Sequence, residues 1–179
     1  MKLLKRAFII ATSIILIFLF ASCSEDEIPT DQEDPATESF EVTNNTYGLG
    51  DTWTVDGQWK FTINSITTTD KRVDLGDDDP AQVVIIDYSY ENLGYEDESG
   101  LMEGLYLDLE NAQVFDEKDT LCDSYPSDLT LFPEEIPVGS TCKAQASFGL
   151  ETESHSVKIV IMEYGGDGTP YEATFDLNY

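Results

Sequence analysis

The chain has few basic residues. Its 179 residues include 9 Lys+Arg and 1 His against 36 Asp+Glu, which gives a formal net charge of −27 at pH 7. Because lysine and arginine supply most of the attraction to phosphate, we expect no nucleic-acid partner, and anionic lipid headgroups are disfavoured for the same reason. The acidic residues therefore either keep the protein soluble or bind cations or a basic partner.

Recognisable catalytic motifs are lacking as well. The only histidine, His155, lies in "ETESHSV", and no nucleophile elbow of the form G-x-S-x-G accompanies it. A glycoside hydrolase needs two catalytic carboxyl groups at a defined separation. With 36 acidic residues, some pair will meet this distance by chance, so the abundance of acids is no evidence for such an enzyme. We therefore assign no catalytic residue, expect His155 in a surface loop and expect that the protein is not an enzyme.

The sequence has one long hydrophobic run, from Ala7 to Phe20, and it follows the basic residues Lys2, Lys5 and Arg6. This order is typical of a secretory signal peptide. The run is shorter than the about 20 residues that a helix needs to span a bilayer. We predict a signal peptide over residues 1–22 and no lasting transmembrane helix.

The end of this segment, Phe20-Ala21-Ser22-Cys23, resembles the lipobox of bacterial lipoproteins, which usually begins with leucine where this chain has Phe20. The resemblance implies that Cys23 receives diacylglycerol and acyl chains such as palmitate, and becomes the first residue of the mature protein. Two acyl chains give a stable anchor where one is marginal. We expect an anchor on the extracytoplasmic face of the cell membrane. The alternative is an ordinary signal peptide that leaves a free Cys23.

An acidic stretch follows Cys23. The segment "SEDEIPTDQEDPATESFE" contains prolines and many acids but no basic residue, and such a composition cannot bury enough apolar surface to fold. Repulsion among its charges favours extended conformations. We predict that residues 23–46 are the lipidated cysteine and a disordered linker, and that residues 47–179 form one folded domain.

Residues 47–179 alternate apolar and polar side chains with a period of two, which is typical of strands. In "DTWTVDGQWKFTINSI", Asp56-Gly57 predicts a tight type I′ hairpin turn. Trp53 and Trp59 fall on strand faces that we assign to the core rather than to a sugar-binding surface. Further rows include "AQVVIIDYSYEN", "LYLDLE", "VKIVIMEY" and "YEATFDL".

Seven or eight short strands at this spacing predict an all-β fold, an immunoglobulin-like antiparallel β-sandwich, with a closed barrel as the alternative. The opening hairpin, "VIIDYSYENLG" with Asn92, and "PVGSTCKAQASFGL" resemble a telokin-like, immunoglobulin-fold domain of unknown function found in Gram-positive lipoproteins. The resemblance covers most of residues 47–179. It implies a fold and no catalytic residue, because the family defines none.

Two further cysteines, Cys122 and Cys142, lie in this domain. A cysteine pair in an exported protein indicates a disulfide, and the alternation of "TCKAQASF" turns Cys142 inward. We predict a bridge between Cys122 and Cys142. A zinc site is the alternative, but it needs about four ligands and the chain has 1 His.

Two acidic clusters are the best candidates for a cation site. Calcium takes six to eight oxygen ligands and tolerates irregular geometry, although neither cluster matches the EF-hand loop. The alternative for both is a solvated loop, and we expect no cofactor other than Ca²⁺. The clusters are Asp74, Asp77, Asp78 and Asp79 in "VDLGDDDP", and Glu96, Asp97 and Glu98 in "GYEDESG".

These features predict a membrane-anchored lipoprotein whose domain is a non-catalytic binding or interaction module at the cell surface. Its expected partners are the membrane, through the lipid anchor, and an unidentified protein or ligand of the cell envelope. The alternatives are a calcium or small-ligand binding protein that uses the acidic loops and a cell-wall hydrolase with an unrecognised site.

Overall fold

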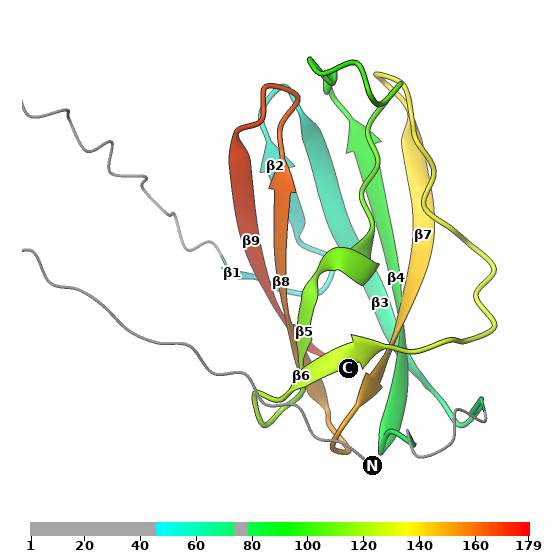
Figure 1. Cartoon of the computed structure of the whole chain (residues 1–179). Coiled ribbons are helices and arrows are strands. Elements are labelled where there is room, and N and C mark those ends of the chain that lie inside the picture. The colour runs from blue at the N-terminus through cyan, green and yellow to red at the C-terminus, as the bar shows by residue number, and fades with distance from the viewer. Residues whose placement is uncertain (1–45, 74–78) are drawn as a thin grey trace, which may run out of the picture. The chain divides into compact units, whose positions relative to one another are not determined.

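The computed structural model describes residues 46–73 and 79–179. The predicted signal peptide, Cys23 and nearly all of the linker therefore lie outside the described residues. The described residues form nine strands and one short 3-10 helix (Figure 1), which confirms the all-β prediction. None of the helical structure in the described part is long and apolar enough to cross a membrane.

The elements follow one another along the chain from Thr46 to Asn178. The first half contains β1 (Thr46–Tyr47), β2 (Thr52–Val55), β3 (Trp59–Thr69), β4 (Gln82–Asn92) and the 3-10 helix η1 (Leu109–Asn111). The second half contains β5 (Gln113–Phe115), β6 (Leu121–Ser124), β7 (Thr141–Leu150), β8 (Ser156–Tyr164) and β9 (Pro170–Asn178).

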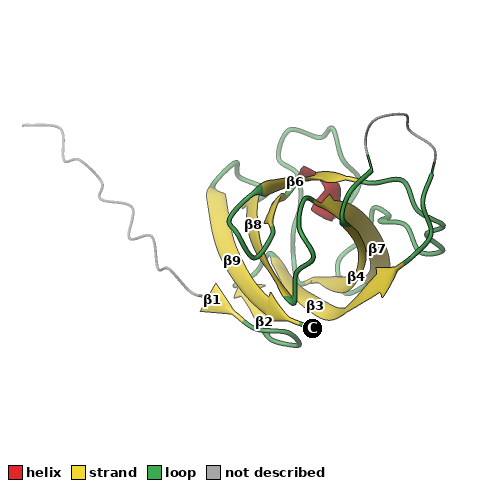
Figure 2. Cartoon of the chain, turned by 90° about the horizontal axis from the view of Figure 1, so that it is seen from below, coloured by secondary structure: helices red, strands yellow, loops and turns green. Residues whose placement is uncertain are grey.

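The strands form one hydrogen-bonded sheet in the order β1-β9-β8-β5-β6-β7-β4-β3-β2. All neighbouring strands are antiparallel except β1 and β9, which are parallel. The short strand β6 pairs with β5 on one side and with β7 on the other, so it joins two facing layers. Seen end-on in Figure 2, the strands curl around the core, and the sheet nearly closes.

The predicted β2–β3 hairpin is present, with a turn that differs from the expected one. Val55 pairs with Trp59, and the Gln58 N–H donates to the Val55 carbonyl oxygen at 3.0 Å. Gly57 has a φ of 72°, which glycine adopts at no steric cost. Asp56 does not have a positive φ, so the turn is not the type I′ turn that the Asp-Gly pair predicted.

The core lies between the inward-facing rows of the strands. Trp53 and Trp59 are 4% and 0% exposed, which confirms their assignment to the core. The Trp59 ring meets Tyr171 edge-on, with 5.5 Å between ring centroids, and Phe61 meets Phe175 at 5.7 Å. These pairs join β3 to β9 across the core, so aromatic packing holds the two layers together.

One predicted strand is not a strand. In "LYLDLE", Leu105 and Leu107 are buried as the alternation indicates, but only Leu105 forms a bridge, to Ile136. The segment then turns into η1, where the Asp108 side chain accepts a hydrogen bond from the Glu110 N–H. Asp108 thereby caps a helical turn, which explains why a row with strand alternation ends in a 3-10 helix.

Candidate functional site

The loops gather at two opposite ends of the sheet. The first, which we call the Asn92 end, contains residues 56–58, 93–104, 134–140 and 165–169. The second, which we call the His155 end, contains residues 116–120, 151–155 and Tyr179. Hydrogen bonds between these segments tie each end together.

At the Asn92 end, the Asn92 side chain is completely buried and completely hydrogen-bonded. Its Nδ2 donates to the carbonyl oxygens of Tyr95 at 3.3 Å and Ile136 at 3.0 Å. Its Oδ1 accepts from the N–H groups of Gly94 at 3.0 Å and Tyr95 at 2.8 Å. This one amide therefore fastens the loop after β4 to the segment before β7, which is a structural role.

The acidic loop at this end is organised by its own hydrogen bonds. The Asp97 carboxylate accepts hydrogen bonds from the Ser99 hydroxyl and from the N–H groups of Ser99, Leu101 and Met102, at 2.7 to 3.0 Å. These bonds, led by the Ser99 hydroxyl, lower the pKa of Asp97 to about 2. Residues 46–73 and 79–179 contain no group of three Asp, Glu, His or Cys side chains that could hold a metal ion. Asp97 thus acts as a loop cap.

Close packing fixes the other two acids of this cluster. The Glu98 N–H donates to the Gly166 carbonyl oxygen at 3.0 Å. A Cβ atom at Gly166 would collide with the Glu96 carbonyl oxygen, so the contact requires glycine in the β8–β9 turn. The backbone, rather than the carboxylates of Glu96 and Glu98, therefore makes the contact, and the structure does not bring these side chains together as a cation site.

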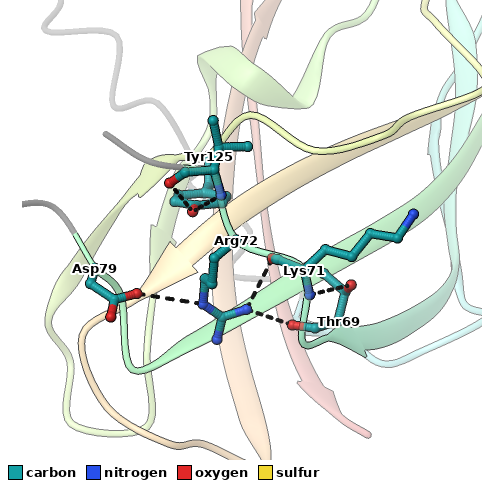
Figure 3. Close-up of polar contacts among 6 residues, drawn as sticks. Thr69, Lys71, Arg72, Asp79 and Tyr125 are labelled. Carbon is teal, nitrogen blue, oxygen red and sulfur yellow. Dashed lines mark hydrogen bonds and ion pairs between the residues drawn. The ribbon is translucent and has the colours of Figure 1, made fainter. Parts of the chain in front are cut away.

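Of the second acidic cluster, only Asp79 lies within the described residues, and its carboxylate forms an ion pair with Arg72. Arg72 Nε lies 3.7 Å from Asp79 Oδ1, and Arg72 Nη1 donates to the Thr69 carbonyl oxygen at 2.7 Å (Figure 3). The Tyr125 hydroxyl bonds to both the N–H and the carbonyl oxygen of Val73. The remaining predicted ligands, Asp74, Asp77 and Asp78, lie outside the described residues.

The predicted disulfide is wrong for this fold. Cys122 and Cys142 are free and buried. Because Asp123 pairs with Gly149, Cys122 lies beside the end of β7, eight residues along that strand from Cys142. At about 3.3 Å per residue this separation is about 26 Å, whereas a disulfide needs Cα atoms within about 7 Å. Both thiols are buried, but they lie at opposite ends of the sheet.

The His155 end contains a surface depression of about 570 Å³. Its walls come from the end of β3, the start of β4, the β7–β8 connection and the residue that follows β9. The lining side chains are mostly polar, and among the described residues none that lines it is an acid, a lysine or an arginine. They are Ile66, Thr67, Thr68, Gln82, Ser154, His155 and Tyr179.

Hydrogen bonds between the walls hold the depression in shape. Gln82 Oε1 accepts from the Ser154 N–H at 2.7 Å, which leaves the Nε2 end of the amide to donate. The Tyr179 N–H donates to the His155 carbonyl oxygen at 3.0 Å, and the His155 N–H donates to Glu117 Oε2 at 3.1 Å. Residues from β4, the β7–β8 connection and the end of β9 are thereby fixed relative to one another.

Tyr179 carries an unsatisfied polar atom. Its hydroxyl is buried and has no hydrogen-bond partner in the described part of the chain. Burial raises the pKa of Tyr179 to about 12, with smaller contributions from Cys122 and Glu117. The nearby Gln82 amide lowers the pKa of Tyr179 by a smaller amount, but it does not form a hydrogen bond with the hydroxyl. A buried hydroxyl without a partner costs about 1–3 kcal/mol, so this position favours any group that could pair with it.

Next to the depression, Asp116 organises the β5–β6 turn. The carboxylate is 3% exposed and accepts hydrogen bonds from the N–H groups of Lys118 and Thr120, both at 2.9 Å, and from the Thr152 hydroxyl at 2.8 Å. Burial acts to raise the pKa of Asp116, but the hydrogen bonds outweigh it and lower the pKa below the ordinary value. Asp116 thus supports the segment that carries His155.

His155 is exposed, as the sequence predicts. The neighbouring Ser154 hydroxyl donates to the Thr152 carbonyl oxygen at 3.1 Å rather than to the imidazole, and it accepts from the Glu117 N–H at 3.3 Å. A serine nucleophile needs its hydroxyl bonded to a base. The adjacent serine and histidine are therefore arranged as parts of a loop and not as a nucleophile and base.

One unusual carboxyl group was missed by the sequence analysis. Glu163 lies at the Asn92 end, on the inward-facing row of β8 after Val157, Ile159 and Ile161. Burial raises the pKa of Glu163 to about 7, and the Asp108 carboxylate adds to the rise. No lysine, arginine or histidine forms an ion pair with it in the described residues. The alternation of "VKIVIMEY" was sufficient to place this acid on the inner face.

No protein-family model and no curated protein matches this chain. Among solved structures, the fold is similar to that of the yjhA protein from Bacillus subtilis, with a TM-score of 0.52 and 15% identity over 73% of this chain and 99% of that one. It is also similar to MPT63, described as a secreted protein from Mycobacterium tuberculosis, with a TM-score of 0.53 and 10% identity over 77% and 99%. At these identities the likeness shows a shared small β-rich fold.

Proposed function

We propose that this protein is an exported lipoprotein whose β domain, residues 47–179, is a non-catalytic binding module held at the extracytoplasmic face of the cell membrane by lipidated Cys23. The domain acts through the depression at the His155 end. In this proposal it belongs with the immunoglobulin-like domains of Gram-positive lipoproteins that its strand signatures resemble, and residues 24–46 provide reach.

The observation that carries the proposal is the depression itself. Its volume of about 570 Å³ lies in the usual range of ligand clefts, about 300–1,000 Å³. Four segments that are distant in the sequence supply its walls, and hydrogen bonds between Gln82, Ser154, His155 and Tyr179 fix them. A preformed site of this kind favours binding, because little ordering is needed when a ligand enters.

Two further observations support binding over the alternatives. The Ser154 hydroxyl is bonded to a carbonyl oxygen, which does not favour a hydrolase at this site. Asp97 and Asp79, from the two acidic clusters, are bonded to backbone N–H groups and to Arg72 respectively, which does not favour calcium at these clusters. Export agrees with the description of MPT63 as secreted and with the basic-apolar-small order of residues 1–22.

The anchor is tested with Cys23→Ser. In cells that produce the protein, the wild type should fractionate with membranes and the variant should appear in the soluble extracytoplasmic fraction. Mass spectrometry of the wild-type N-terminus should show a diacylated Cys23. A variant that stays in the membrane fraction and is cut at the same residue contradicts the tether.

Binding is tested with isolated cell-envelope material and full-length Cys23→Ser protein, which cannot sediment through acyl chains. In this test the wild type is the Cys23→Ser protein with an intact depression. The wild type should co-sediment with this material, and Thr67→Ala/Thr68→Ala, which changes two exposed residues of the depression, should bind markedly less. Thr54→Ala is the matched control, because Thr54 is an exposed threonine on β2, outside the depression. Failure of the wild type to co-sediment, or equal binding by the double variant, contradicts the proposed function.

A further inference from the structure

We propose that the depression at the His155 end binds a neutral carbohydrate, a short stretch of sugar units presented by a glycan. This inference rests on the proposed function and names the ligand class of that same site. Three properties of the lining support it: its lack of aspartate, glutamate, lysine and arginine side chains, the type of its hydrogen-bonding groups, and the presence of two flat rings.

The lack of charged side chains of these four types does not favour a strongly charged ligand. An anionic ligand would meet neither lysine nor arginine among the lining residues, on a protein with a formal net charge of −27. A cationic ligand would meet no aspartate or glutamate side chain in the lining, and Glu117 already accepts the His155 N–H. A charged group that enters such a site loses hydration without gaining a partner, so the lining favours an uncharged ligand.

The hydrogen-bonding groups match those of a sugar. Thr67, Thr68 and Tyr179 each carry a hydroxyl, which both donates and accepts, as the hydroxyls of a sugar do. The Gln82 amide has its oxygen committed to Ser154 and its nitrogen free to donate. Tyr179 adds a buried hydroxyl without a partner in the described residues. A ligand hydroxyl that reaches it removes the cost of leaving that group unpaired.

The two rings provide apolar surface. Tyr179 and His155 both line the depression, and their backbones are joined by a hydrogen bond from the Tyr179 N–H to the His155 carbonyl oxygen at 3.0 Å. His155 is exposed and Tyr179 is partly exposed. Flat side chains of this kind bury the C–H face of a ligand while nearby polar groups fix its orientation. Ile66, which is buried, adds apolar surface to the lining.

The test is isothermal titration calorimetry of the full-length protein with three neutral trisaccharides: maltotriose, cellotriose and chitotriose. We expect saturable heat with at least one of them. Thr67→Ala/Thr68→Ala should weaken that binding about tenfold and Tyr179→Phe about threefold, because each removes hydroxyl partners of the ligand. Thr54→Ala should leave the affinity unchanged.

Salt separates a neutral ligand from a charged one. The affinity should stay within about twofold between low and high salt, because screening acts only between charges. A steep loss of affinity in salt would overturn the assignment of a neutral ligand. Absence of saturable heat with all three trisaccharides, or unchanged affinity in both depression variants, would overturn the carbohydrate site.

The two proposals can fail separately. If the Cys23→Ser protein with an intact depression co-sediments with envelope material and its double threonine variant does not, while no trisaccharide binds, the binding function stands and the carbohydrate inference is wrong. If neither envelope material nor trisaccharide binds, the proposed function is wrong and the inference falls with it.

Discussion

Each end of the sheet leaves one buried polar atom without a partner, and the two ends differ in what surrounds it. At the Asn92 end, the Trp59 Nε1 has no hydrogen-bond partner among the described residues, and the ring is 0% exposed and packed against Trp53, Tyr95 and Tyr171. At the His155 end, the unpaired Tyr179 hydroxyl belongs to a residue that lines a depression. Neither polar atom is itself exposed, but Trp59 is enclosed by aromatic rings, whereas Tyr179 also lines a depression.

This difference distinguishes an unpaired polar atom that is only part of the packed core from one that belongs to a binding site. An unpaired polar atom indicates a binding site only where a cavity gives a partner access to it. The Asn92 end also satisfies the buried Asn92 amide completely, and these bonds join the loop after β4 to the segment before β7. We infer that the Asn92 end mainly stabilises the fold and that the His155 end keeps hydrogen-bonding capacity for a ligand.

The largest expected effect is at the Asn92 end. Asn92→Ala removes the acceptor of the Gly94 and Tyr95 N–H groups, and it removes one of the two donors to the Ile136 carbonyl oxygen, which still accepts the Leu105 N–H. We expect a loss of about 3–5 kcal/mol in the free energy of unfolding, measured in urea. Asn64→Ala is the control, since Asn64 is exposed and bonded only to Ser89 in the described residues. Equal stability of the two variants would show that Asn92 does not organise this end.

A smaller loss is expected from Asp116→Ala at the His155 end. It removes three hydrogen bonds to a buried carboxylate, and we expect a loss of about 2–3 kcal/mol at neutral pH. Asp123→Ala, an exposed aspartate on the neighbouring strand β6, should change stability by less than about 0.5 kcal/mol.

The effect of Asp116 depends on pH in a defined direction. Because folding lowers the pKa of Asp116, its contribution is fully present above the pKa of an unfolded aspartate, about 3.9. It is lost as the pH falls through the folded pKa. The difference between wild type and Asp116→Ala should therefore shrink in acid, and a difference that grows below pH 4 would contradict the role of the ionised carboxylate.

Glu163 should show the opposite pH dependence. Folding raises its pKa from 4.5 to about 7, so the folded state binds the proton more tightly and loses stability as the pH rises through this interval. Glu163→Gln should match the wild type near pH 4 and be more stable by about 1–2 kcal/mol at pH 8. Urea unfolding at both pH values measures this, with the exposed Glu172→Gln on β9 as control. Equal gains at both pH values would show that the ionised carboxyl is not the cause.

The sequence predicted the parts of this fold that depend on local patterns. Alternation placed Trp53 and Trp59 in the core, and Asp56-Gly57 marked a hairpin whose turn type it did not determine. The run from Leu105 to Leu109 kept its buried row but not its strand, because Asp108 caps a helical turn. The very short strands β1 and β5 carry too few residues for alternation to appear.

The site was harder to predict, because it depends on which segments the sheet brings together. Cys122 and Cys142 both point inward, yet strand pairing puts them at opposite ends, and spacing along the chain does not encode this. Similarly, Thr67, Gln82 and Tyr179 meet only after nine strands have paired. The residue types indicated that each of these side chains is polar, but they did not indicate that the three line one depression.

The smallest expected effect tests the comparison between the two unpaired atoms directly. Tyr179→Phe keeps the ring and removes only the hydroxyl that has no partner among the described residues. In the absence of a ligand we expect the free energy of unfolding to rise by about 0.5–1 kcal/mol, because a buried polar group without a partner is removed. The same variant should bind ligand more weakly, so stability and affinity change in opposite directions.

Urea unfolding with and without saturating trisaccharide measures both, since a ligand that binds the folded state adds to its stability. Tyr164→Phe, at an exposed tyrosine on β8, should change neither quantity. A loss of stability in Tyr179→Phe without ligand would mean that the hydroxyl already has a partner in the free protein, and the distinction between the two ends would then disappear.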